Sequence, residues 1–401
     1  MMTVDGPGWP AVGFESVEWH ASVEPGVSRR AALKARGPYD AAIPPLIAGL
    51  PIPPLDSETV TAAEDAVLEL ARFDSEVGAI AAPFSVILLR SESAASSEIE
   101  NLTASAKNIA LAELGRKTGG NSRLIVGNVR AMEAAIEMAE ELDVATIISM
   151  QSALLRNDQP EHTGAWRDQA VWIGGGYANS PHSASFVPPR HERLAELMDD
   201  LVAFARRTDL PAMAQIAITH AQFETIHPFP DGNGRTGRAL IQAMLNRLGV
   251  TRQVTVPVSA GLLRDTSAYF AALTDYRAGQ VVPIMRAVTD ASLEAVVNGR
   301  RLVADLTAIR ARWERDATPR AGSAGRRLLD FLQQQPVVDA HAVGTALGVS
   351  ERNAQNGIDR LVGDGVLHQI GSASRMRAYE SREVLFALDA FAARAKRRGR
   401  P

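Results

Sequence analysis

The sequence contains no cysteine among its 401 residues. Disulfides, cysteine-ligated metals and a cysteine nucleophile are therefore excluded. It also lacks any run of the ~20 apolar residues that a membrane helix requires. Residues 1–18 carry no lysine or arginine, so the basic start of a secretion signal is missing. From these absences we expect a cytoplasmic protein with no membrane segment.

A strong charge of either sign is missing as well. The formal net charge is −4, with 42 basic and 46 acidic side chains. The overall charge therefore gives no reason to expect nucleic acid or an acidic membrane surface as a partner. Hydrophobic residues make up 46% of the chain, which suffices for the cores of the roughly two or three domains that this length predicts.

Pro and Gly divide the chain into regions of different character. The first ~55 residues are rich in both and predict an extended arm lying over a domain. Apolar residues at helical spacing predict helices from Ser57 onward and then, in order, over 86–114, 129–141, 144–156, 191–206 and 211–225. Helices are expected again from Asp231 to about Ala311, and the polar stretch 312–325 predicts a linker.

The segment 227–238, HPFPDGNGRTGR, lies between two helical patterns. Gly232 and Gly234 let backbone N–H groups approach a ligand closely, and the start of the following helix favours an anion. Arg235 and Arg238 lie three residues apart and so occupy neighbouring positions on that helix. Two guanidinium groups beside an anion-binding turn suit a polyphosphate.

A base and a metal ligand complete this segment. His227 has a side chain that accepts a proton from a hydroxyl near neutral pH. Asp231 places a carboxylate beside the anion site, and Mg²⁺ commonly binds few protein ligands together with phosphate oxygens. The combination predicts phosphoryl-group chemistry. It is not a Walker loop, because the Gly-Lys-Ser/Thr ending is absent.

The same segment resembles the Fic motif, HxFx(D/E)GNGRxxR, at every specified position. The resemblance implies a Mg²⁺-dependent protein adenylyltransferase, which moves AMP from ATP to a Ser, Thr or Tyr hydroxyl of a target protein, itself included, and releases pyrophosphate. It implies that His227 is the general base, that Asp231 binds Mg²⁺ and that Arg238 pairs with the γ-phosphate. The other nucleotide-binding positions that it implies are Gly232, Asn233, Gly234, Arg235, Thr236 and Gly237.

Residues 96–101, SSEIEN, resemble the inhibitory motif of the same family, [S/T]xxxE[G/N]. Ser96 and Glu100 are four residues apart, so we expect them on one side of a helix. The resemblance implies that Glu100 forms a salt bridge to Arg238 and occupies the space that the γ-phosphate needs. Ser-rich helix starts with a nearby glutamate are also common N-caps, so the motif gains its meaning from the catalytic segment.

Val171, Trp172, Ile173 and Gly174 form a short strand-like run, and a second apolar run covers 184–187. Two such runs with turn residues between them predict a β-hairpin. The hairpin resembles the Fic flap, which pairs its main chain with the target segment by β-augmentation. An edge hairpin with a buried Trp172 is the structural alternative.

Tyr269 and Phe270 fall where relatives often carry an aromatic pair beside the adenine. Phe270 departs from the Tyr-Tyr form, which removes a hydroxyl. A core position is an equal alternative for both residues, and Arg277 is a weaker candidate for the same pocket. His220 has apolar neighbours at helical spacing, so we expect it in the core and not as a second base.

Residues 326–380 resemble a winged helix, with helix, helix, turn, helix and a two-stranded wing. The helix 350–361 carries Arg352 and Arg360, but Glu351 and Asp359 cancel their charge. DNA binding is therefore less favoured than packing or protein contacts. The basic tail 394–400 is expected to be solvated.

The expected fold is mainly α, a Fic-type helical bundle with a small β-hairpin flap and a C-terminal winged-helix domain. The expected divisions are an N-terminal arm and inhibitory helix at 1–104, a catalytic domain with trailing helices at 105–311 and the winged helix at 326–390. The expected partners are ATP and a target protein, and dimers occur among relatives. Two alternatives stay open: a Fic-type transferase with another nucleotide or diphosphate donor, and a winged-helix DNA-binding regulator with a nearly silent Fic core.

Overall fold

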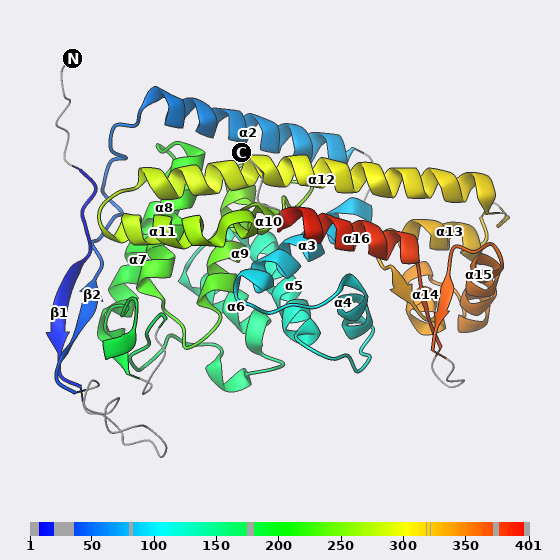
Figure 1. Cartoon of the computed structure of the whole chain (residues 1–401), viewed down its shortest axis with the longest axis horizontal. Coiled ribbons are helices and arrows are strands. Elements are labelled where there is room, and N and C mark those ends of the chain that lie inside the picture. The colour runs from blue at the N-terminus through cyan, green and yellow to red at the C-terminus, as the bar shows by residue number, and fades with distance from the viewer. Residues whose placement is uncertain are drawn as a thin grey trace. The chain divides into compact units, whose positions relative to one another are not determined.

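A computed structural model shows that the chain is mostly helical (Figure 1). The structure describes residues 8–19, 36–79, 83–174, 180–317, 319–320, 322–371 and 377–396. None of the helices in these ranges combines the length and apolar character that a membrane crossing needs. The chain forms two compact units, the first made of 1–65, 134–248 and 267–289, and the second of 66–133, 249–266 and 290–401.

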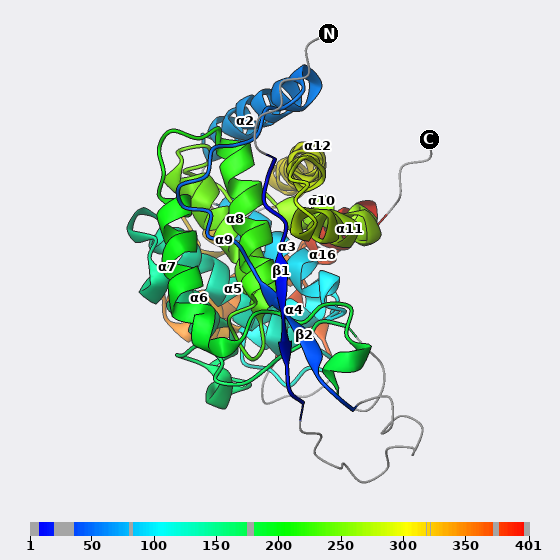
Figure 2. The ribbon, with the colours of Figure 1, turned by 90° about the vertical axis from the view of Figure 1, so that its left-hand side faces the viewer.

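Four helices form the centre of the first unit (Figure 2). They are α6 (Val144–Leu155), α7 (Leu194–Ala205), α8 (Ala212–Ile226) and α9 (Asn233–Arg247). α8 packs against α7 and α9, and α6 packs against the same two helices. Every residue of α8 after its first is buried, so α8 is the central helix, and the segment 227–238 begins at its C-terminal end.

Two strands of the N-terminal arm form an antiparallel sheet in the first unit. β1 (Gly13–Val17) pairs with β2 (Tyr39–Ile43), with the first residue of β1 opposite the last residue of β2. Trp9 packs against the ring of Tyr276, and the Asp200 carboxylate on α7 accepts two backbone amides that follow β2, at 2.6 and 3.0 Å. The described part of the arm contains these two extended segments, and their pairing is additional to the prediction.

α3 (Pro83–Ile99) is the central helix of the second unit. It packs against α10 (Val258–Leu262) and α16 (Arg382–Ala395), and α16 also packs against α4 (Ala106–Glu113). Asn128 ties α3 to α5 (Ser122–Glu137), because its side-chain amide donates to a backbone carbonyl of α3 at 2.9 Å.

The remaining helices complete the two units. α2 (Ser57–Gly78), α5 (Ser122–Glu137) and α12 (Val282–Asp316) each have residues in both units, and α11 covers Thr266–Arg277. The short 3₁₀ helices are η1 (Ala139–Glu141), η2 (Pro160–His162), η3 (Pro181–Ser183), η4 (His191–Arg193) and η5 (Leu263–Asp265). α12 continues to Asp316, so the linker predicted from residue 312 begins later than expected.

The single helix expected over 86–114 is wrong, because the chain breaks into α3 and α4. The amide of Asn101 donates to the carbonyl of Glu98 at 2.8 Å, and the amide of Leu102 donates to that of Ser97 at 3.0 Å. This is a Schellman turn, and its left-handed residue is Asn101 with φ 61°. Asn adopts this conformation more readily than most residues, because its short polar side chain bonds locally.

The C-terminal segment has the element order that the sequence predicts, with one further strand. The order is α13 (Ala324–Phe331), β3 (Val337–Val338), α14 (Ala340–Leu347), α15 (Glu351–Gly363), β4 (His368–Ile370) and β5 (Ala378–Glu380). The three strands form an antiparallel sheet in the order β3-β5-β4. Assignment of this segment to the winged-helix class stays a prediction.

Candidate active site

His227 is the residue at which α8 ends. Its backbone is left-handed, with φ 50° and ψ 60°, and its amide donates to the carbonyl of Phe223 at 2.9 Å. A left-handed non-glycine residue costs about 1–3 kcal/mol and persists only where its surroundings hold it. The chain direction at His227 is therefore imposed by neighbouring contacts.

Arg167 supplies those contacts. Its Nε donates to the carbonyl of His227 at 2.9 Å, its Nη2 lies 3.4 Å from the carbonyl of Ile226, and its amide donates to the carbonyl of Pro228 at 2.9 Å. Arg167 is only 3% exposed, and burial lowers the pKa of its guanidinium to about 10, so it stays charged at neutral pH. The sequence prediction missed Arg167, which lies 60 residues before His227 and belongs to no motif.

Asn233 closes the loop that follows His227. Its side-chain carbonyl accepts the amide of Phe229 at 2.9 Å, and its side-chain N–H₂ donates back to the carbonyl of Phe229 at 2.8 Å. Gly232 is the N-cap of α9 with φ 82°, and a Cβ there would lie 2.8 Å from Leu154. The left-handed backbone therefore favours glycine, and a Cβ would also displace the end of the Leu154 side chain. The first amides of α9 have no acceptor within the helix, as an anion site needs.

Asp231 presents the exposed carboxylate of the loop. One oxygen accepts the amide of Gly232 at 2.6 Å, the other lies 3.6 Å from Nη2 of Arg235, and the side chain is 43% exposed. Gln151 donates to the backbone carbonyl of Asp231 at 3.3 Å and holds it from α6. The described residues contain no group of three or more His, Asp or Glu that could hold a metal. One accessible carboxylate fits Mg²⁺ when phosphates and water supply the other ligands.

Glu224 lies one turn before His227 on α8. Its Oε2 is 3.9 Å from Nδ1 of His227. The negative charge on that side favours a proton on Nδ1, which leaves Nε2 as the basic nitrogen. The sequence prediction did not include Glu224, although a carboxylate three residues before a histidine on a helix is a readable signal.

His220 is a neutral core residue, as expected. Its Nδ1 lies 3.0 Å from the carbonyl of Gly237, which only accepts, so Nδ1 carries the proton and Nε2 accepts from the Tyr269 hydroxyl at 2.7 Å. Burial, together with the charge of Arg238, lowers the pKa of His220 to about 3. Tyr269 is thus a buried core residue, and of the predicted aromatic pair only Phe270 is open, at 49% exposure.

Residues 235–245 of α9 are all buried. A Cβ on Gly237 would lie 2.7 Å from Glu224 and 3.0 Å from Phe223, so this glycine permits the close packing of α8 on α9. Thr236 is buried in the same helix, and Arg235 and Arg238 are buried at 4% and 1% exposure. Burying a guanidinium is costly unless an anion pairs with it. The nucleotide contacts predicted for these residues, and for Gly234, stay predictions.

The expected flap is a single bridge, not the predicted pair of strands. Ile173 and Phe186 form an isolated antiparallel bridge, with the amide of Ile173 donating to the carbonyl of Phe186 at 2.8 Å. Val171, Trp172 and Gly174 flank it, Trp172 is half-buried, and the tip at 175–179 lies outside the described residues. The guanidinium carbon of Arg277 lies 3.8 Å from the centre of the Phe186 ring. Arg277, the weaker candidate for the adenine pocket, therefore contacts the residue that forms the bridge with Ile173.

The candidate inhibitory residues belong to the end of α3. Ser96 is buried, and Glu100 is the exposed C-cap residue that precedes the left-handed Asn101. The Gly-or-Asn position of the motif is therefore the position at which the helix needs a left-handed residue. Glu100 belongs to the second unit and Arg238 to the first, and their salt bridge stays a prediction.

A strained histidine, an exposed carboxylate and two buried arginines around a helix start define a candidate phosphate-transfer site. Residues 141–245 match the Fic/DOC family model, which includes α6 to α9 and the loop between α8 and α9. The chain therefore contains a Fic domain. A Fic family protein from Desulfovibrio desulfuricans shares the fold, with TM-score 0.53 and 20% identity over 83% of this chain and 98% of that one.

Two curated relatives illustrate the similarity. The chain is 27% identical over 207 residues to the protein adenylyltransferase fic-1 of Caenorhabditis briggsae, which aligns 48% of this chain with 38% of the relative. It is 29% identical over 156 residues to the protein adenylyltransferase Fic of Nematostella vectensis, with 38% and 33% covered. The chain thus spans less than half the length of the curated relatives it matches.

Proposed function

We propose that this protein transfers AMP from ATP to a Ser, Thr or Tyr hydroxyl of a target protein. The observation that carries the proposal is the loop from His227 to Arg238, which unites a base, an exposed carboxylate, the start of a helix and two buried cations. The names of the relatives, protein adenylyltransferase, support the same reaction.

In the proposed reaction, Nε2 of His227 accepts the proton of the target hydroxyl. The hydroxyl oxygen attacks the α-phosphorus of ATP in line, and the bond to the bridging oxygen breaks, which releases pyrophosphate. The first amides of α9, together with Arg235, bind the α- and β-phosphates, and Arg238 binds the γ-phosphate. Arg167 and Glu224 act through His227 as positioning residues.

Asp231 would hold Mg²⁺ in this site. The ion supplies charge neutralisation for the phosphates when it is bound. The fit rests on the accessible Asp231 carboxylate, since its neighbour Arg235 lies 3.6 Å away and leaves it open on its exposed side. The flap residues Val171 to Gly174 would present the target, because an extended segment that forms one bridge has further main-chain groups to pair.

The activity is proposed to be restrained by Glu100. The motif that contains it ends in the Schellman turn of α3, which fixes the backbone at Glu100. A carboxylate paired with Arg238 would take the place of the γ-phosphate and prevent productive binding of ATP. Loss of the Glu100 carboxylate should therefore raise AMP transfer.

The test compares wild type, Glu100→Gly and Glu100→Gly/His227→Ala after incubation with α-labelled ATP and a cell lysate. We expect label in protein with Glu100→Gly, less with wild type and none with the double variant. His341→Ala in the Glu100→Gly background is the matched control, because His341 is exposed and lies in α14. Mass spectrometry of the modified protein identifies the transferred group. An added mass of AMP supports AMP transfer from ATP, and any other added mass excludes it.

A further inference from the structure

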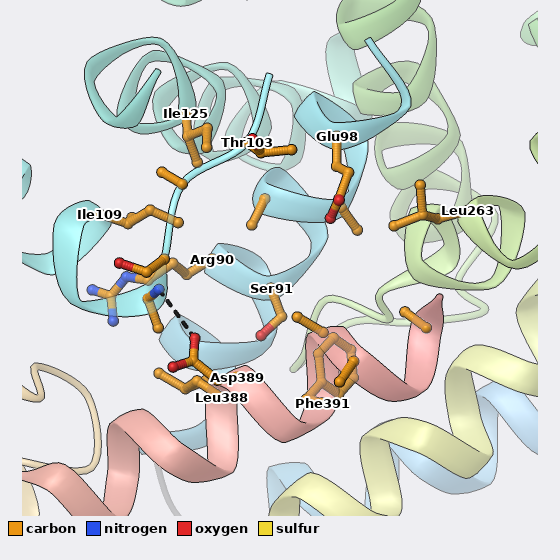
Figure 3. A pocket seen from close by; sticks show the side chains of 18 of the residues that line it. Arg90, Ser91, Glu98, Thr103, Ile109, Ile125, Leu263, Leu388, Asp389 and Phe391 are labelled. Atoms are coloured by element: carbon orange, nitrogen blue, oxygen red, sulfur yellow. Dashed lines mark hydrogen bonds between the residues drawn. The ribbon is translucent and has the colours of Figure 1, made fainter. Parts of the chain in front are cut away.

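A cavity of about 420 Å³ lies in the second unit, apart from the residues of the catalytic loop. Figure 3 shows apolar side chains around it, among them Ile109 of α4, Ile125 of α5, Leu263 of η5 and Phe391 of α16. Its apolar walls include Leu102, Ile109, Ile125, Leu263 and Phe391. Ligand-binding cavities commonly measure about 300–1,000 Å³ and have mostly apolar walls with a few polar groups. This cavity meets both conditions.

Two cations line the cavity, and each already has an anionic partner. The Arg90 guanidinium donates to Glu113 at 2.8 Å, and its remaining nitrogens donate to Gln334 and Gln335 at 2.6 and 3.0 Å. Lys396 pairs with Glu98 at 2.6 Å. Neither ion pair leaves a net charge for a ligand to neutralise.

Asp389 is the remaining charged group of the cavity wall. Among the residues that the structure describes, its carboxylate forms no salt bridge, and its one hydrogen bond is a long one from the amide of Ala106, at 3.3 Å. Figure 3 shows this contact as the dashed line at the start of α4. Asp389 is exposed, so the cavity has at its rim one solvated carboxylate that is in no salt bridge with a described residue, beside apolar walls.

We propose that this cavity binds a small amphipathic amine, with an apolar body among the hydrophobic side chains and a protonated nitrogen paired with Asp389. A carboxylate or phosphate ligand would be repelled by Asp389, and the two cations of the cavity, Arg90 and Lys396, already have anionic partners. A neutral apolar ligand would gain no interaction with Asp389. The amine is the class that satisfies both the walls and the charge.

The cavity is also continuous with the turn that carries Glu100. Glu98 and Leu102 line it, and both contribute to the Schellman turn at the end of α3. An occupant that contacts them favours the folded turn over its opened form, because a ligand stabilises the conformation that it binds. If the proposed function holds, stabilisation of the folded turn by the amine strengthens the restraint by Glu100 and lowers AMP transfer.

Binding is tested by calorimetry with phenethylamine, 2-phenylethanol and phenylacetate, which share a ring and differ in charge. We expect phenethylamine to bind best and Asp389→Asn to weaken it about two- to fivefold, since Asn keeps the acceptor for Ala106 and removes the charge of an exposed ion pair. Asp305→Asn, on α12 and outside this cavity, should bind as wild type does. Equal binding of the three probes, no binding of phenethylamine, or no effect of Asp389→Asn would overturn the site.

The coupling is tested by AMP transfer in phenethylamine at about ten times its Kd. We expect transfer by wild type to fall up to about tenfold, if the amine binds only the restrained state, and transfer by Glu100→Gly to be unchanged. Equal inhibition of both proteins, or of neither, would overturn the coupling. No transfer by Glu100→Gly without amine would instead contradict the proposed function, so the two failures are distinct.

Discussion

Replacing Arg167 with Lys keeps the positive charge beside His227 and removes the planar guanidinium. The side chain of Arg167 donates to four backbone carbonyls, those of Gln169, Pro189, Ile226 and His227, at 3.0, 2.5, 3.4 and 2.9 Å. A single ammonium nitrogen cannot reach acceptors that lie around a fork of three nitrogens. We therefore expect the Lys ammonium to donate to about two of the four backbone carbonyls.

The magnitude follows from the carbonyls that are left without a donor. Each buried acceptor that loses its partner costs about 1–3 kcal/mol, so two of them lower the free energy of unfolding by roughly 2–6 kcal/mol. The left-handed turn at His227 also loses its support. A shift of about 1 Å in a catalytic group can reduce the rate about 100-fold, and we expect kcat/KM to fall by that order.

The assay uses the Glu100→Gly background, so that the restraint does not mask the effect. Urea unfolding measures stability, and initial rates of AMP transfer measure kcat/KM at a temperature at which both proteins are folded. Arg190→Lys is the matched control, because Arg190 is exposed and pairs with Glu192. A destabilised Arg167→Lys protein with unchanged kcat/KM would refute the positioning role, and unchanged stability would refute the hydrogen-bond argument.

Two further predictions concern the packing of α8 on α9. His220 has a pKa of about 3 in the folded state against 6.5 when unfolded, so unfolding takes up a proton between these values. Stability should fall with decreasing pH over that window, by up to about 1.4 kcal/mol per pH unit, and His220→Gln should flatten the dependence in urea titrations. Gly237→Ala should lower the free energy of unfolding by about 1–3 kcal/mol, because its Cβ would lie 2.7 Å from Glu224. The control Gly363→Ala should not lower it, because a Cβ there meets nothing within 4 Å. Equal urea midpoints for the two variants would contradict this prediction.

The catalytic loop was predictable because its chemistry is contiguous. Gly232, Asp231 and Arg238 lie within one turn and one helix start, where their residue types predict an anion site beside a metal ligand; these roles stay predictions. Helix periodicity likewise predicted α6 to α9 within a few residues, since their buried faces repeat at helical spacing.

The supporting contacts were not predictable, because they join distant residues or depend on a single backbone angle. Arg167 reaches His227 from 60 residues away, and no local pattern distinguishes it from a surface arginine. The break after α3 depends on the left-handed Asn101, which apolar periodicity does not record. The pairing of β1 with β2 joins two short segments, and short pairings across long connections carry little local signal.

The most direct test of the account is the intact mass of Glu100→Gly protein after incubation with ATP and Mg²⁺. The account predicts a mass increase of one or more AMP groups, which disappears when His227→Ala is added. The same increase in the His227→Ala protein, or no AMP on Glu100→Gly and on any target in lysate, would contradict it.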